Sequence, residues 1–131
     1  MHARIVDLKL DYPNICHWWS AWDWPAVPLD ILPPTGFIVS NKGADICAAW
    51  LYLTNSRLAS IEWIISNRDT TREQRAGGIE YLFEHIAKRA KEAYYSHLIT
   101  NLTHKGLSKR LTQIGYGEAD TGLTSMIKII E

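Results

Sequence analysis

The chain lacks several features that would mark a particular class of protein. Its 14 basic and 14 acidic residues balance to no net charge, which does not favour nucleic acid or an anionic membrane as a partner. Cys16 and Cys47 are its only cysteines, too few for a disulfide framework and not spaced as metal ligands. No apolar run approaches the roughly 18 residues of a membrane span, and charges interrupt the first ten residues, unlike a signal peptide.

The composition is that of one globular domain. The 131 residues are 47% hydrophobic and 21% charged, which suits a single domain with one core over residues 1–131. We expect a cytoplasmic protein that needs no metal, since its histidines show no ligand spacing. A neutral surface gives no charge protection against self-association, so the composition is also compatible with a homodimer.

The first third of the chain predicts a strand, a helix and a connection. Ala3–Leu10 alternates apolar and polar residues, as a half-buried strand does. Pro13 and Asn14 are typical of a helix start, and the apolar residues of Ile15–Trp22 follow helical spacing. Residues 24–34 carry four prolines, which exclude regular helix and central strand. This segment is also apolar, so we expect it to lie against the domain.

Three strands and a helical crossover follow. Turn residues separate three strand-like runs that predict an antiparallel meander: Gly36–Ser40, Ile46–Leu53 and Leu58–Ser66. A long amphipathic helix then leads to a short buried strand, His97–Thr100, which makes a βαβ unit. A helix over Gly106–Ile114 and a last strand over Leu123–Ile130 complete the pattern. We therefore predict an α/β (α+β) fold whose mixed, mostly antiparallel central sheet is flanked by helices.

A basic, glycine-containing segment begins the long helix and has two interpretations. Arg72, Gln74 and Arg75 precede Gly77-Gly78. If they form a turn before the helix, backbone N–H groups and positive charge would hold a phosphate. Alternatively, Thr71-x-x-Gln74 is a capping box that starts the helix at Arg72. Each glycine then lies inside the helix at a cost of about 1 kcal/mol relative to Ala, and close approach of a cofactor or another helix would explain it.

The order of these elements resembles the GCN5-related N-acetyltransferase (GNAT) superfamily over nearly the whole chain. Members carry Gln/Arg-x-x-Gly-x-Gly/Ala before the long helix, and Gln74–Ile79 is similar, with Ile79 in the last Gly/Ala place. "TNLTHKGLSKRLTQIGY" also resembles the family, with Asn101 and Gly115-Tyr116 in the expected places but Leu111 where many members have Tyr. The Trp-rich helix and "LPPTGFIV" resemble small phage-encoded members, which would act in the cytoplasm of a bacterium or of a phage-infected host.

The resemblance implies an acyl-CoA N-acyltransferase-like fold and transfer of an acetyl group from acetyl-CoA, as co-substrate, to an amine of a small molecule or protein. The amine would attack the thioester directly. Glu62, the acid within Leu58–Ser66, would be the base, and Tyr116 a secondary candidate for proton donation. The backbone of Trp63, Ile64 and Ile65 would bind the carbonyl and the pantetheine arm. The other implied cofactor-binding residues are Arg72, Gln74, Arg75, Ala76, Gly77, Gly78, Asn101, His104 and Lys105.

Each of these assignments has a structural alternative. Strict alternation places Glu62 and Ile64 on one face of the strand, where Glu62 would be a surface acid. Trp22 and Trp24 would form an aromatic wall for the acceptor, or else help to cover the sheet. The departures at Ile79 and Leu111 favour a second hypothesis, a catalytically degenerate GNAT-fold protein that acts as a binding, inhibitory or structural phage protein. The segment 18–34 would then be its interaction surface.

Overall fold

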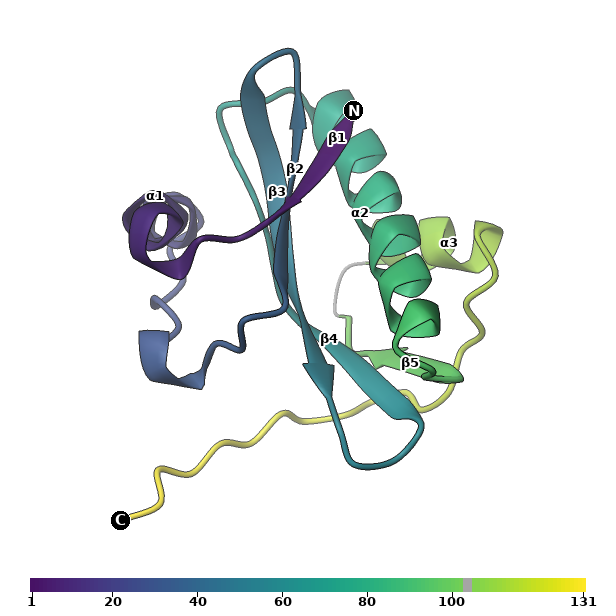
Figure 1. Ribbon diagram of the computed structural model, residues 1–131. Coiled ribbons are helices and arrows are strands. Elements are labelled where there is room, and N and C mark those ends of the chain that lie inside the picture. Colours follow the sequence, from purple (N-terminus) through teal and green to yellow (C-terminus); the bar gives the residue numbers. More distant parts are fainter. Residues whose placement is uncertain (103–104) are drawn as a thin grey trace.

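The computed structural model describes residues 1–102 and 105–131, and its centre is a five-stranded sheet (Figure 1). The first four strands pair antiparallel in chain order, and the fifth pairs parallel with the fourth. The mixed, mostly antiparallel sheet predicted from the sequence is confirmed. The strands are β1 (His2–Ile5), β2 (Gly36–Asn41), β3 (Ala44–Leu53), β4 (Leu58–Ser66) and β5 (His97–Thr100).

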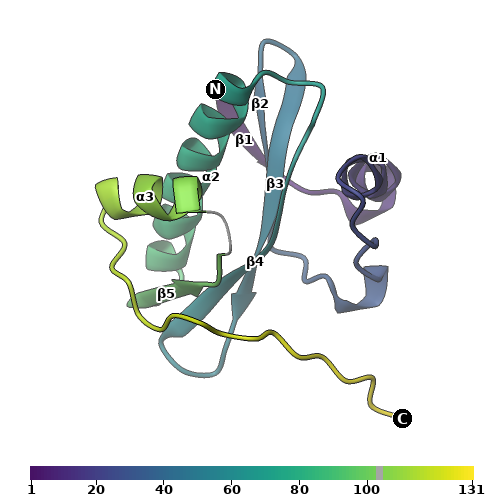
Figure 2. The ribbon, with the colours of Figure 1, turned by 180° about the vertical axis from the view of Figure 1, so that it is seen from behind.

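Helices cover both faces of the sheet (Figures 1 and 2). On one face lie α1 (Leu8–Ala21) and the short 3-10 helix η1 (Leu29–Ile31), while α2 (Arg72–Glu92) and α3 (Lys105–Gln113) lie on the other. We call these the α1 face and the α2 face. Among the described residues, no helix combines the length and apolarity needed to cross a membrane.

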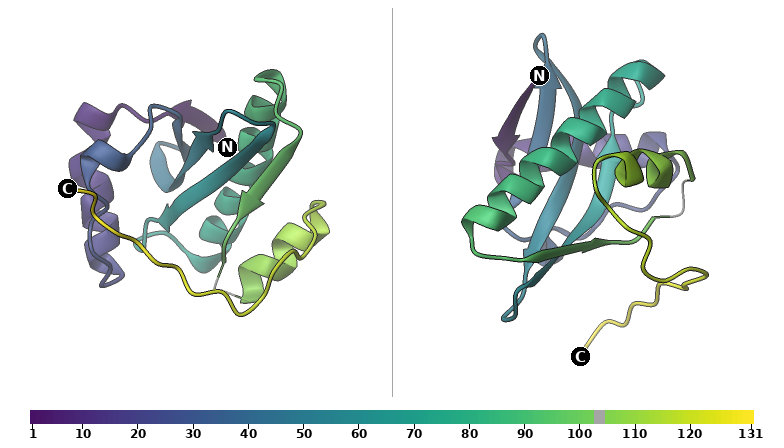
Figure 3. Two further views of the ribbon diagram at one scale, coloured as in Figure 1. Left: turned by 90° about the horizontal axis from the view of Figure 1, so that it is seen from below. Right: turned by 90° about the vertical axis from the view of Figure 1, so that its right-hand side faces the viewer.

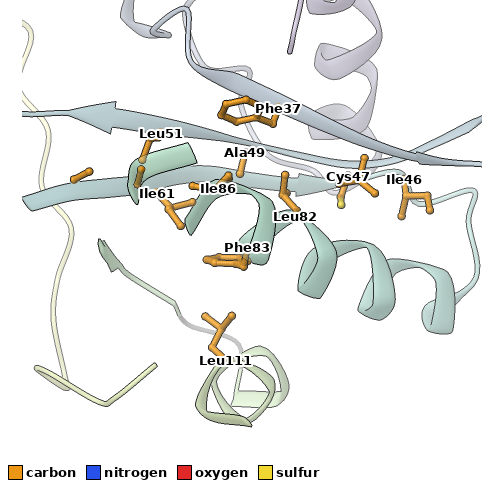
Figure 4. Packing of buried hydrophobic residues seen from close by; sticks show 13 residues of the cluster. Phe37, Ile46, Cys47, Ala49, Leu51, Ile61, Leu82, Phe83, Ile86 and Leu111 are labelled. Atoms are coloured by element: carbon orange, nitrogen blue, oxygen red, sulfur yellow. The ribbon is translucent and has the colours of Figure 1, made fainter. Parts of the chain in front are cut away.

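Each face of the sheet has its own hydrophobic cluster. On the α1 face Trp50 is fully buried and stacks on Trp19, with 5.9 Å between the ring centroids. On the α2 face Phe83 packs between the sheet and Leu111 of α3 (Figure 4). From Cys47 to Leu51, residues of β3 alternate between the two clusters, as the period of a strand requires. Val27 and Leu32 are buried, so the proline-rich connection lies against the domain as predicted.

The N-terminal prediction was wrong at its boundaries. β1 ends at Ile5, and α1 begins at Leu8 rather than near Ile15. The reason is Asp7, whose carboxylate accepts hydrogen bonds from the N–H groups of Lys9 and Leu10 and so caps the helix. Pro13 consequently lies inside α1, where its ring leaves one helical hydrogen bond unmade.

An ion-pair network fastens β1 to its neighbours. The Arg4 guanidinium donates to both carboxylate oxygens of Asp11, at 2.8 and 3.0 Å, and reaches Asp45 on β3 at 3.3 Å. The hydrogen bond from Arg4 lowers the pKa of Asp11. The network therefore joins β1, α1 and β3 on the α1 face.

The predicted last strand is not formed. Residues 123–130 have no strand partner in the part of the chain that the structure describes, and their apolar side chains are exposed to solvent, with Ile127 at 80% and Ile130 at 91%. The alternation of this segment is that of a strand, but a strand needs a neighbour to satisfy its backbone. The prediction of a strand over Leu123–Ile130 is therefore wrong for the single chain.

Candidate active site

The candidate site is built around a bulge in β4. Ala48 pairs with Ile65 and Trp50 pairs with Glu62, so two residues, Trp63 and Ile64, lie opposite Ala49 alone. Trp63 has a φ of +58°, a left-handed conformation that a bulky side chain avoids. Such conformations cost about 1–3 kcal/mol and concentrate at functional sites. The bulge is thus a feature that the surrounding structure holds in place.

The bulge lies on an open edge of β4. Pairing with β5 covers only Leu58–Ile61, so the segment Glu62–Ser66 has no partner on that side among residues 1–102 and 105–131. The two strands diverge beyond this point (Figure 3). Ile64 lies at the divergence, since it packs against the α2-face cluster and also lines a hollow on the other side. Backbone groups at the bulge are therefore placed where an extended ligand could bind.

Glu62 faces the α1 side of the sheet. Its cross-strand partner Trp50 belongs to the α1-face cluster, whereas Ile64 packs with the α2-face cluster. The prediction that Glu62 and Ile64 share a face was wrong, because the extra residue of the bulge shifts the alternation by one. The Glu62 carboxylate is half-buried and forms no hydrogen bond or ion pair with a described residue, and burial raises its pKa.

An apolar hollow of about 230 Å³ adjoins the bulge. Trp63 forms one wall and is fixed by its indole N–H, which donates to the Tyr52 hydroxyl at 2.6 Å. Tyr52 in turn donates to the carbonyl of Ile31 at 2.7 Å. The side chains around the hollow come from α1, the proline-rich connection and β4: Trp19, Trp24, Pro25, Val27, Trp63 and Ile64. Its chemistry suits an apolar group next to the bulge, one residue along the strand from Glu62.

Trp22 occupies a different place from Trp24. Its indole N–H donates to the carbonyl of Ser66 at 2.9 Å, at the end of β4. The guanidinium groups of Arg68 and Arg75 lie over its ring, 4.9 and 5.6 Å from the centroid. Of the two predicted acceptor residues, the structure places Trp24 at the hollow, while Trp22 anchors the loop between β4 and α2.

The start of α2 follows the second interpretation of the glycine-containing segment. The Thr71 hydroxyl accepts from the N–H of Gln74, and the Gln74 side chain accepts from the N–H of Thr71, so a capping box starts the helix at Arg72. Arg75 donates to the carbonyls of Arg68 and Thr70. Gln74 and Arg75 therefore hold the loop in shape, whereas Arg72 is exposed in the first turn.

Gly77 and Gly78 lie inside α2 with Ala76, so the expected turn before the helix was wrong. A close approach to β3 explains Gly78 but not Gly77. A Cβ on Gly78 would meet Cγ2 of Ile46 at 2.7 Å, and one on Gly77 would meet the end of Met1 at 3.1 Å. Gly78 thus lets the helix pack tightly on the sheet.

Tyr116 and Glu62 are not brought together. The Tyr116 ring packs edge-on against Phe83 in the α2-face cluster, with 5.7 Å between centroids. Its hydroxyl is buried without a hydrogen-bond partner among the described residues, and burial raises its pKa to about 12. Leu111, which stands where many members of the family have a tyrosine, is buried in the hydrophobic core.

The remaining predicted residues follow β5. Asn101 is exposed directly after the strand, and Lys105 is the first residue of α3. His104 lies outside the described residues. Within the described chain, no three His, Cys, Asp or Glu side chains are grouped so that they could hold a metal ion.

The sequence did not predict Tyr52 and Val27 as residues of this site. The apolar, proline-rich composition of residues 24–34 was nevertheless a signal that this segment, which contains Val27, packs against the domain.

No protein-family model and no curated protein sequence matches the chain. Solved structures do resemble it. TTHA1254 from Thermus thermophilus superposes with a TM-score of 0.70 at 14% identity over all of both chains. Rv2747 from Mycobacterium tuberculosis, in complex with CoA and NLQ, gives 0.73 at 13% over 95% of this chain and 77% of that one. The ribosomal-protein-S18-alanine N-acetyltransferase from Escherichia coli gives 0.71 at 15% over 91% and 79%.

These likenesses identify the class of the fold. The chain has the acyl-CoA N-acyltransferase fold, which its resemblance to the GNAT superfamily implied. At 13–15% identity they show the fold alone, so the activity has to be argued from this chain's own site.

Proposed function

We propose that the protein is an acetyl-CoA-dependent N-acetyltransferase in which an amine attacks the thioester directly. The observation that carries this proposal is the bulge at Trp63 and Ile64, on the open edge of β4 and next to Glu62, whose carboxylate has no partner among the described residues. Backbone N–H groups along Trp63–Ile65 would bind the thioester carbonyl and the pantetheine arm, which would run beside this edge. A neighbour of the same fold has CoA bound, which supports the choice of donor.

Glu62 accounts for one of the two proton transfers, and solvent water for the other. The amine nitrogen attacks the carbonyl carbon, the C–S bond breaks, and its electron pair leaves with the sulfur. The proton lost by the amine passes to Glu62, directly or through a water molecule, because a half-buried carboxylate with a raised pKa is a stronger base than an exposed one. Tyr116 holds its proton but faces the α2 side, so we assign reprotonation of the thiolate to solvent water.

Acetyl-CoA is expected to raise the melting temperature of the protein. A ligand at 100 times its Kd adds about 2.7 kcal/mol to the free energy of unfolding. Free N–H groups in the first turn of α2, together with Arg72, would bind the diphosphate, so Arg72→Ala should weaken binding several-fold, and less so at high salt. Exposed Lys88, on the far part of α2, provides the matched control, Lys88→Ala. A melting temperature unmoved by saturating acetyl-CoA would contradict the donor and favour the non-catalytic hypothesis.

The acceptor is expected to be an amine with an apolar body. The hollow at the bulge is walled by Trp19, Trp24, Trp63 and aliphatic side chains, which bind aryl or alkyl groups through the hydrophobic effect. Trp24→Ala removes one wall, and we expect kcat/KM for an arylalkylamine to fall about tenfold. For ethanolamine, which cannot fill the hollow, kcat/KM should change little. Steady-state kinetics with both amines tests this, and an equal loss for the two would contradict an acceptor role for the hollow.

A further inference from the structure

One wall of the hollow at the bulge is not held in place by burial. Trp19 is 2% exposed and stacks on Trp50, so the core of the α1 face fixes its ring. Trp63 is 37% exposed, and its φ of +58° is a conformation that a bulky side chain avoids. Such a residue keeps one arrangement only where surrounding groups impose it. The contact that holds the Trp63 ring therefore decides the shape of the hollow.

The Tyr52 hydroxyl supplies that contact. It accepts a hydrogen bond from the Trp63 indole N–H at 2.6 Å and donates one to the carbonyl of Ile31 at 2.7 Å. A tyrosine hydroxyl has one proton to donate and lone pairs with which to accept, and this geometry uses it in both directions. The hydroxyl therefore joins three parts of the chain: β3, the bulge of β4, and η1 within the proline-rich connection.

The same hydroxyl lies near the proposed base. The register of the two strands pairs Tyr52 with Ser60, and Glu62 is the next residue of β4 on that face. Burial and the charge of Glu62 raise the pKa of Tyr52, against the hydrogen bond from Trp63, which lowers it. The carboxylate is thus close enough for its charge to act on the hydroxyl. Tyr52, Trp63 and Glu62 consequently form one group on the α1 face, next to the hollow that Trp63 lines.

We propose that Tyr52 is a positioning residue for the acceptor: its hydroxyl holds the Trp63 indole in the orientation that lines the hollow, and so sets where an apolar amine lies relative to Glu62. The inference rests on the proposed N-acetyltransferase function for its catalytic meaning, while the hydrogen bond and the hollow can be tested in the free protein. Without the hydroxyl, Trp63 and the carbonyl of Ile31 would bond to water instead, since these residues are 37 and 36% exposed. The fold should therefore survive the loss of the hydroxyl, while the wall of the hollow should not stay in place.

Binding of 2-phenylethylamine, measured by calorimetry with and without CoA, tests the proposal without catalysis. Tyr52→Phe removes the hydroxyl and keeps the ring, and we expect Kd to rise about fivefold, the effect of one hydrogen bond. Trp63→Phe keeps an aromatic wall without the N–H donor and should weaken binding by a similar factor. The double variant should bind no more weakly than the weaker single variant, because both substitutions break the same hydrogen bond. No binding to the wild type, wild-type affinity in Tyr52→Phe, or additive effects would each overturn the proposal.

Tyr12 supplies the matched control. Its hydroxyl donates to the carbonyl of Val27 at 2.8 Å, so it too is bound to the proline-rich connection, but through a hydrogen bond that does not involve Trp63. Any effect of Tyr12→Phe on Kd should therefore add to that of Trp63→Phe. If Tyr12→Phe were as non-additive with Trp63→Phe as Tyr52→Phe is, the coupling would reflect a general loosening of the connection, and the positioning role of Tyr52 would fail.

Steady-state kinetics separates this proposal from the proposed function. For 2-phenylethylamine we expect Tyr52→Phe to raise KM about fivefold and to leave kcat within about twofold of the wild type, while kcat/KM for ethanolamine stays unchanged. If acetyl-CoA binds and Tyr52→Phe acetylates both amines as the wild type does, the positioning role fails and the N-acetyltransferase stands. If acetyl-CoA does not bind but Tyr52→Phe and Trp63→Phe still weaken amine binding non-additively, the transferase fails and Tyr52 still positions the bound amine.

Discussion

Replacing Glu62 with Gln is expected to lower kcat/KM for acetyl transfer by about 10²–10³-fold, within the range that general base catalysis contributes. Gln keeps the size of the side chain and its position opposite Trp50, but it cannot take the proton of the attacking amine. The Kd for acetyl-CoA should stay within about twofold of the wild type, because the proposed donor contacts are made by the backbone of the bulge and by the start of α2. Kinetics and calorimetry on the same preparations measure both quantities.

The pH dependence of the same variant gives a sharper signature. Burial raises the pKa of Glu62 in the folded protein, so the wild-type rate should rise with pH as this carboxyl ionises, and Glu62→Gln should lose that rise. An arylamine acceptor of low pKa keeps titration of the amine itself out of the profile. Exposed Glu84 on α2 supplies the control: Glu84→Gln should retain both the rate and its pH dependence.

The Glu62→Gln variant, although less active, is expected to be at least as stable as the wild type at neutral pH. A carboxyl whose pKa is higher in the folded than in the unfolded state holds its proton more tightly when folded. Its contribution to the free energy of unfolding is fully present below the unfolded-state pKa and is lost as pH rises through the folded-state pKa. At neutral pH Glu62→Gln should therefore melt no lower than the wild type, and the difference should vanish in acid. If the variant kept the wild-type rate at every pH, Glu62 would have no part in the reaction.

The strands of the sheet were predictable because local signals agreed. The runs at 36–40, 46–53 and 58–66 are rich in β-branched and aromatic residues and are separated by turn residues at 41–43 and 54–56, and all three form strands. The start of α1 was not predicted, because Leu8–Leu10 alternates like a strand while the Asp7 cap makes it helical. The strand predicted over Leu123–Ile130 is not formed for a related reason, since an alternating pattern alone does not supply a neighbouring strand to pair with.

The place of Glu62 within a strand was predictable from the sequence, but the backbone geometry around it was not. Glu62 stood out as a single acid in an apolar strand, and it does lie next to the bulge. The bulge itself has no marker in the sequence: Trp63 in a left-handed conformation goes against its local preference, and the assumption of strict alternation assigned Ile64 to the wrong face. Deviations of this kind from local rules are expected where function outweighs stability.

Gly77 and Gly78 show a third limit of prediction from the sequence, because the residue that a helix glycine approaches can be distant in sequence. Two glycines in a helix signal a close approach, but the sequence does not say whether a phosphate, a helix or a strand approaches. In the structure Gly78 is buried against Ile46 and Cys47 of β3, whereas the Gly77 position faces only the flexible end of Met1. The two neighbours therefore offer a matched pair of substitutions.

Gly78→Ala is expected to lower the free energy of unfolding, and Gly77→Ala to leave it unchanged or raise it. A Cβ at Gly78 would lie 2.7 Å from Cγ2 of Ile46 and 3.3 Å from Sγ of Cys47. Overpacking of this kind costs about 1–3 kcal/mol, which outweighs the ~1 kcal/mol gained in helix propensity. At Gly77 the Cβ meets only Cε of Met1 at 3.1 Å, which can move aside, so the propensity gain should remain.

Denaturant unfolding of both variants, with acetyl-CoA titrated into each, tests this contrast. Since both glycines lie inside α2, their N–H groups are engaged in the helix, and Gly77→Ala should bind acetyl-CoA as the wild type does. A stable Gly77→Ala variant that had lost acetyl-CoA affinity would instead assign the second turn of α2 to the diphosphate. A Gly78→Ala variant as stable as the wild type would mean that α2 and β3 are not in tight contact, and the explanation of Gly78 by helix–sheet packing would fail.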